Sequence, residues 1–225
     1  MVPSWQPAGH LMHFPQLDAG FNISAYTIGW RITDAPDIWT NRFLRFKAKS
    51  YGDIIGGAWV LKRALLNLFS ITNQRPESTG LITALSSKNV TADTSSPLYR
   101  AGNILAKQLG MKWIPTAISK KIHESLHEIK NARDRDAEVH NKYECTKIDG
   151  LTDIIILDDF VTRGATFGEI TRSINMSNTG ITIKCLALAK NESKSYAQSY
   201  GVAVDNSHIP PSWDALWKLG QESVK

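Results

Sequence analysis

The chain has 225 residues, of which 42% are hydrophobic, so it can bury one substantial core with at most a small appended subdomain. Its two cysteines exclude a disulfide framework and a cysteine-rich zinc site, as is typical of a reducing cytoplasm. A net charge of +5 suits an anionic ligand. Without an amino-terminal signal pattern or an apolar run of about 20 residues, we expect a cytoplasmic protein with no membrane span.

The amino-terminal part of the chain predicts short elements. Residues 1–40 hold several aromatic side chains among prolines and glycines, and we expect short strands and turns that cap one end of the core. Residues 42–49 alternate basic and apolar side chains, which predicts a strand with one solvated basic face. A nucleic-acid-binding strip over residues 42–49 is the alternative. Helical periodicity follows over residues 58–69.

Residues 79–115 predict a strand, a helix and a second strand in succession. Residues 79–85 predict a buried strand, which is followed by the sequence Ser-Ser-Lys at residues 86–88. An amphipathic helix is expected over residues 97–109, with Gly110 as its carboxyl-terminal stop. Residues 111–115 predict the strand that comes after it.

A long polar segment, residues 120–147, then separates two predicted strands, and it is expected to be a functional flap or a helical excursion. It contains His-Glu-Ser-Leu-His at residues 123–127, the H-E-x-x-H pattern of zinc metalloproteases. Glu138 or Glu144 would be the third zinc ligand. The charged surroundings argue against the buried active-site helix that such a hydrolase needs, so zinc hydrolysis is a remote alternative.

Residues 154–166 read Ile-Ile-Ile-Leu-Asp-Asp-Phe-Val-Thr-Arg-Gly-Ala-Thr and predict a buried strand, an acid pair and a tight loop. A helix over residues 167–174 is expected next. The loop's backbone N–H groups, the helix start and the two threonine hydroxyls can bind a phosphate monoester. The two acids, at the carboxyl end of the strand, can accept hydrogen bonds from sugar hydroxyls. This order of groups predicts a sugar phosphate ligand.

The same run is similar to the phosphoribosyl pyrophosphate (PRPP) signature of type I phosphoribosyltransferases. The resemblance implies that the acids hold the ribose hydroxyls, that the loop holds the 5′-phosphate, and that the basic flap closes over the pyrophosphate. Arg163 stands where the family more often has Thr or Gly. The site residues implied are Asp158, Asp159, Arg133 and Arg135 for catalysis, and Asp158, Asp159, Thr162, Arg163, Gly164, Ala165, Thr166 and Lys88 for PRPP binding.

The implied fold is an α/β, parallel-sheet type I phosphoribosyltransferase fold with helices on both faces and a small hood or tail. A strand over residues 181–188 agrees with it. The tail is expected to be a hood over the ribose, a lid on an acceptor base or, by default, edge packing. The expected organisation is an amino-terminal cap (1–40), a phosphoribosyltransferase core (41–191) and a carboxyl-terminal tail or hood (192–225).

Within the superfamily the chain looks most like the ComF group, which is associated with DNA uptake and commonly has an amino-terminal zinc ribbon that this chain lacks. The implied reaction transfers phosphoribosyl from PRPP, which carries Mg²⁺, to a nitrogen nucleophile with release of pyrophosphate; the acceptor stays open. A non-catalytic PRPP or nucleotide sensor, a nucleic-acid-associated partner protein and a defence or toxin effector are the alternatives. A homo-oligomer or a protein partner is also expected.

Overall fold

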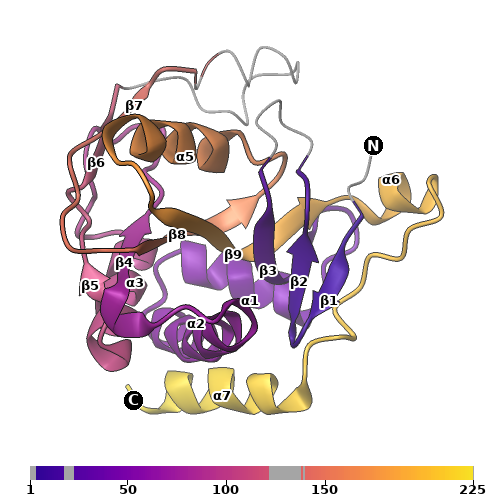
Figure 1. Ribbon diagram of the computed structural model, residues 1–225. Coiled ribbons are helices and arrows are strands. Elements are labelled where there is room, and N and C mark those ends of the chain that lie inside the picture. The colour runs from indigo at the N-terminus through magenta and orange to yellow at the C-terminus, as the bar shows by residue number, and fades with distance from the viewer. Residues whose placement is uncertain (1–3, 18–22, 122–137, 139, 225) are drawn as a thin grey trace.

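The computed structural model describes residues 4–17, 23–121, 138 and 140–224, and it forms an α/β fold around a seven-stranded mixed sheet (Figure 1). The sheet order is β1-β2-β3-β9-β8-β4-β5. Its strands are β1 (Gln6–Ala8), β2 (Leu11–Phe14), β3 (Ala25–Ile32), β4 (Thr79–Thr83), β5 (Lys112–Trp113), β8 (Asp153–Val161) and β9 (Thr182–Glu192). The helices are α1 (Ile38–Lys47), α2 (Tyr51–Thr72), the 3-10 turn η1 (Pro76–Ser78), α3 (Pro97–Leu109), α5 (Ala165–Ser177), α6 (Lys194–Gln198) and α7 (Pro211–Glu222).

The five strands β3, β9, β8, β4 and β5 run parallel, and β2 and β1 extend one edge in antiparallel fashion. The predicted α/β architecture with a mostly parallel sheet is therefore confirmed. Within the described part of residues 1–40, strands form as expected, and β1, β2 and β3 make up one side of the sheet. The predicted helix over residues 97–109 matches α3, and Gly110 ends it with a φ of 71°.

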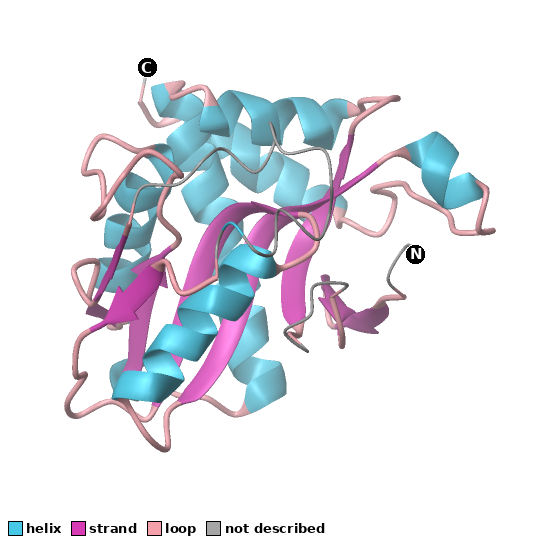
Figure 2. Cartoon of the chain, turned by 90° about the horizontal axis from the view of Figure 1, so that it is seen from above, coloured by secondary structure: helices cyan, strands magenta, loops and turns pink. Residues whose placement is uncertain are grey.

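Helices cover both faces of the sheet, as predicted, but unequally (Figure 2). Successive side chains of a strand point to opposite faces, so β8 contributes to two separate cores. Ile155 and Leu157 belong to the core shared with α1, α2, α3 and α7, whereas Ile154 and Ile156 belong to the core shared with α5. All four side chains are fully buried, which explains the uninterrupted apolar run in the sequence.

The strand predicted over residues 42–49 is wrong, because most of these residues lie in helix α1. The Asp37 side chain caps the helix by accepting from the N–H of Thr40 at 2.7 Å. Trp39, Phe43 and Phe46 are spaced at helical intervals and are buried on one face of α1. Three of the basic residues each face a carboxylate, with Arg42 buried and Arg45 and Lys47 half-exposed. These pairs are Arg42 with Asp214, Arg45 with Asp53, and Lys47 with Asp159.

Helix α2 extends beyond the predicted 58–69 segment, and glycines in its first half let it lie close against its neighbours. A Cβ on Gly56 would come within 2.6 Å of the Trp217 carbonyl oxygen on α7, and one on Gly57 within 2.5 Å of the Phe46 ring. By length and composition α2 could cross a membrane, but more than half of its apolar stretch is buried between the sheet, α3 and α7. It is therefore a core helix of this fold.

The polar segment over residues 120–147 lies mostly outside the described residues. Its two ends form a small antiparallel sheet of β6 (Ile118–Lys120) and β7 (Tyr143–Cys145), in which Lys120 pairs with Tyr143. The end after the segment is tied to α5, because the buried Glu169 accepts from the N–H of Asn141 at 2.8 Å. The small sheet is thus anchored beside the helix that follows β8.

Candidate functional site

The order of the strands places a crevice between β4 and β8. From β4 the chain passes through α3 to β5 on one side, and from β8 it passes through α5 to β9 on the other side. The two helices consequently lie on opposite faces of the sheet, and the loops that precede them diverge. In open α/β sheets such a switch point opens a crevice at the carboxyl ends of the strands, where ligands bind. The topology therefore identifies this edge as the candidate site.

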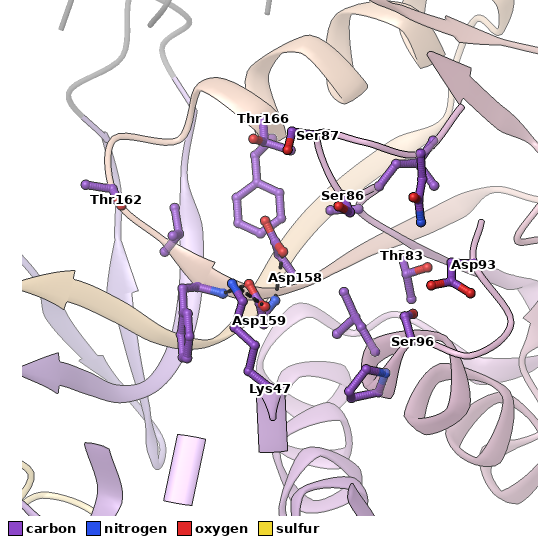
Figure 3. Close-up of a pocket in the computed structure, with 18 of the residues that line it drawn as sticks. Lys47, Thr83, Ser86, Ser87, Asp93, Ser96, Asp158, Asp159, Thr162 and Thr166 are labelled. Carbon is purple, nitrogen blue, oxygen red and sulfur yellow. Dashed lines mark hydrogen bonds and ion pairs between the residues drawn. The ribbon is translucent and has the colours of Figure 1, made fainter. Parts of the chain in front are cut away.

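A cavity of about 580 Å³ occupies this crevice. Its walls come from the loop after β4, the start of α3, the end of β8, the loop into α5 and the carboxyl end of α1 (Figure 3). Its lining combines polar and charged side chains with apolar ones, among them Phe46, Leu98 and Phe160. Every described residue of the predicted PRPP site lies in this lining: Lys88, Asp158, Asp159, Thr162, Arg163, Gly164, Ala165 and Thr166.

The acid pair lies inside β8, which continues to Val161 instead of stopping at the acids as predicted. The ladder with β4 ends where Thr83 faces Leu157, but the ladder with β9 continues to the end of β8. Asp158 and Asp159 are therefore held by the sheet on one side and open to the cavity on the other. As neighbours in a strand they point to opposite faces.

Asp159 faces α1, where its Oδ2 lies 2.9 Å from the Nζ of Lys47 (Figure 3). Asp158 faces the small sheet, where its charge acts on Lys120 and Tyr143. Burial, and then repulsion from Asp159, raises the pKa of Asp158 well above the usual carboxyl value. The two acids of the pair are thus unequal, because only Asp159 has an ion-pair partner among the described residues.

Lys120 and Tyr143 lie beside Asp158, and both side chains are buried although each carries a polar group. Burial lowers the pKa of Lys120 to about 8, and the charge of Asp158 opposes that change. Burial also raises the pKa of the Tyr143 phenol, whose hydroxyl donates to the Leu85 carbonyl at 3.3 Å. The phenol is therefore neutral and links β7 to the loop after β4.

The loop after β8 ends in an open helix terminus. Gly164 precedes α5 with a φ of 88°, and a Cβ there would lie 2.7 Å from Cδ1 of Leu17. Among the described residues no side chain caps this end, and the first intrahelical bond runs from the N–H of Gly168 to the carbonyl of Gly164. The first-turn N–H groups and the helix dipole therefore favour an anion beside the loop.

The two threonines of this loop have different surroundings. Thr162 is exposed, its Oγ accepts from Asn191 Nδ2 at 3.1 Å, and its side chain points away from the acid pair in Figure 3. Arg31 on β3 donates to Oδ1 of the same Asn191 at 3.2 Å. The Arg31–Asn191–Thr162 chain thus anchors the start of the loop, while Thr166 lies at its far end on the first turn of α5.

The loop after β4 forms the opposite wall. The N–H of Ala84 donates to the Leu157 carbonyl at 2.8 Å, which ties the loop start to β8 just before the acids. Ser86, Ser87 and Lys88 follow, and Lys88 is exposed at the cavity rim. Their hydroxyl and ammonium groups can donate to a second anionic group. The cavity accordingly offers donors at two walls, with the acids between them.

Several sequence predictions fall outside the described residues. They are Arg133 and Arg135 as flap cations and the H-E-x-x-H run at residues 123–127. Of the proposed third zinc ligands, Glu138 lies 3.9 Å from Lys142, and Glu144 is an exposed residue of β7. No cluster of three metal-ligating side chains forms within the described part of the chain.

Sequence reasoning missed Lys47, Tyr143 and Asn191 as lining residues of the cavity. Asn191 lies in β9, which continues beyond the strand expected over residues 181–188, and its position opposite Thr162 comes from the parallel register of β8 and β9. Lys47 was assigned to a strand, so its reach toward the acid pair was not visible.

Comparison with known proteins adds no family to these observations. No protein-family model matches the sequence, and no curated protein matches it either.

Proposed function

We propose that this chain is a phosphoribosyltransferase that binds PRPP at the crevice between β4 and β8. The observation that carries the proposal is the placement of an acid pair and of a helix terminus that no described side chain caps on one strand-loop-helix unit that lines a single cavity. The acids suit a ribose diol, and the helix terminus suits a phosphate. We further propose that the mostly parallel sheet is a type I phosphoribosyltransferase core, as the PRPP-like signature implies.

The chemistry assigned to the residues follows from their positions. The first turn of α5 would hold the 5′-phosphate, and Asp158 and Asp159 would accept from the ribose hydroxyls, so that the sugar lies across the cavity floor. Lys88 and the serines before it would hold the pyrophosphate. As the bond to pyrophosphate breaks, the ribose ring becomes positively charged, and the nearby carboxylates stabilise that charge. A nitrogen nucleophile then completes the transfer.

The residues present are compatible with Mg²⁺ carried by the ligand, because carboxylate oxygens are hard donors that suit this ion. Asp158 and Asp159 are the described side chains that would face it. When bound, Mg²⁺ would neutralise charge on the leaving pyrophosphate. The protein's own part is to orient the ribose and the two anionic groups.

Turnover tests the proposal. The wild type would be incubated with PRPP, Mg²⁺ and a panel of purine, pyrimidine, ammonia and nicotinamide-like acceptors, with pyrophosphate release as the readout. We expect release with one acceptor class, lost in Asp158→Asn/Asp159→Asn and kept in Asp153→Asn, a change at the opposite end of β8. Binding of PRPP without release for any acceptor would instead identify a non-catalytic PRPP sensor.

A further inference from the structure

Helix α1 brings a cation to the acid pair from a part of the chain far from the signature. Lys47 is the last residue of α1, and its Nζ lies 2.9 Å from Oδ2 of Asp159 and 5.0 Å from the centre of the Phe160 ring. All three residues line the cavity. The ammonium is thus fixed by a carboxylate and by an aromatic face at the same time.

This contact is one of two that hold the Asp159 carboxylate, the other being the N–H of Phe160. A strand residue at the end of β8 has no β4 neighbour to restrict it, because that ladder stops at Leu157. The side chain of Asp159 is only 23% exposed, and its N–H donates to Asp158 at 2.8 Å. Lys47 holds Oδ2 of Asp159, and Oδ1 accepts from the N–H of Phe160 at 2.7 Å. Each carboxylate oxygen therefore has one partner and keeps a lone pair for a ligand hydroxyl.

We propose that Lys47 is a positioning residue, which orients the Asp159 carboxylate so that it accepts from the ribose diol of the bound ligand. The inference rests on the proposed function, since it concerns the same site. It assigns to α1 a part in selecting a ligand with both the 2′- and 3′-hydroxyls, because a misdirected carboxylate would lose its preference for the diol. Lys47 acts here through Asp159 and not as a direct contact of the phosphates.

Paired ligands separate these two roles. Affinities for ribose 5-phosphate, 2-deoxyribose 5-phosphate and inorganic pyrophosphate would be measured by calorimetry for the wild type, Lys47→Met and Lys47→Arg. We expect Lys47→Met to reduce the preference for ribose 5-phosphate over its 2-deoxy analogue by about tenfold, the order of a coupling within one contact network. Pyrophosphate affinity should stay the same, and Lys47→Arg should restore most of the preference.

Lys49→Met is the matched control, because Lys49 lines the same cavity but its Nζ faces Ser95 Oγ at 3.5 Å instead of the acids. It removes an equal charge and should leave the ribose-to-deoxyribose ratio at the wild-type value. Equal weakening of all three ligands in Lys47→Met would overturn the inference, because Lys47 would then be a general cation. Tighter ribose 5-phosphate binding would also overturn it, since the ion pair would then compete with the ribose.

A ligand-free measurement separates failure of this inference from failure of the proposed function. The charge of Lys47 lowers the pKa of Asp158, although burial and Asp159 outweigh it. The Asp158 carboxyl, followed by carbon NMR with Asp158→Asn as the assignment control, should titrate at higher pH in Lys47→Met but not in exposed Lys107→Met. If the wild type binds no sugar phosphate, the proposed function fails, and an unmoved Asp158 titration would then overturn the placement of Lys47 as well.

Discussion

The backbone N–H of Asp159 donates to the Oδ1 of Asp158 at 2.8 Å, so the two members of the acid pair are joined to each other although they point to opposite faces of the sheet. Asp159 is paired with Lys47, whereas Asp158 lies toward a wall of buried polar groups. The pair is therefore asymmetric before any ligand arrives, and this asymmetry has consequences for stability and binding.

Asp158→Asn is expected to stabilise the protein at neutral pH. The raised pKa means that the native state binds the Asp158 proton more tightly than the unfolded chain does. Stability from this group is therefore present at acid pH and is lost as the pH rises from the usual carboxyl range through the native pKa. The amide keeps an oxygen for the N–H of Asp159 without this loss.

Urea unfolding across a pH series measures this effect. The free energy of unfolding of Asp158→Asn should exceed that of the wild type near pH 7, and the difference should shrink toward acid pH. A difference that does not change with pH, or a variant less stable than the wild type at neutral pH, would contradict the account of Asp158.

Gly164→Ala is expected to damage the loop and the fold together. The left-handed φ costs about 1–2 kcal/mol for any other L-residue, and the new Cβ would also meet Leu17. Gly110→Ala is the control, because its φ of 71° carries the same backbone cost in open space. Chemical denaturation should show a larger loss for Gly164→Ala, and only that variant should lose affinity for PRPP. Equal losses of stability in Gly164→Ala and Gly110→Ala would contradict this prediction, because Leu17 would then accommodate the new Cβ without cost.

Trp217→Ala is expected to destabilise the protein without changing the site. Trp217 is fully buried between α7 and α2, and its Nε1 donates to Asp53 at 3.0 Å. Truncating a buried aromatic side chain costs about 3–5 kcal/mol. PRPP affinity, measured at a temperature where the variant is folded, should match that of the wild type. A selective loss of affinity would instead support a hood or lid role for the tail.

Lys88→Met should separate the two anionic ends of the ligand. Lys88 lies at the rim on the wall opposite α5, so its loss should weaken PRPP and inorganic pyrophosphate but leave ribose 5-phosphate unchanged. Calorimetry with the three ligands measures this directly. Weaker ribose 5-phosphate binding in Lys88→Met would show that the pyrophosphate end is assigned to the wrong wall.

The sequence was sufficient for the parts of the fold whose signals are local. The strand β8 could be predicted because burial on both faces requires an uninterrupted apolar run. The end of α3 could be predicted because its left-handed backbone favours glycine, here Gly110. The loop before α5 was readable because its glycine and hydroxyl residues occur together. The predicted signature residues and Lys88 consequently line one cavity, as far as the described residues extend.

The predictions failed where contacts between distant parts of the chain determine the local structure. Helix α1 was taken for a strand because its basic and apolar residues alternate over a short run, yet Trp39, Phe43 and Phe46 also fit a helix that begins after the capping Asp37. The start of α2 was missed because its glycines resemble a loop, and the close packing of α7 and of Phe46 on α1 explains them. Lys47 could not be placed at the site until the direction of α1 was known.

Calorimetric titration of PRPP with Mg²⁺ into the wild type, Asp158→Asn/Asp159→Asn and the matched control Asp153→Asn tests whether the acid pair binds the ligand. Asp153 lies at the other end of β8 and accepts from Gln74 at 2.8 Å, so this variant removes a carboxylate from the same strand without touching the cavity. We expect saturable binding at one site in the wild type and in Asp153→Asn, and no binding in the double variant. Absence of binding in the wild type, or equal binding in all three proteins, would contradict this expectation.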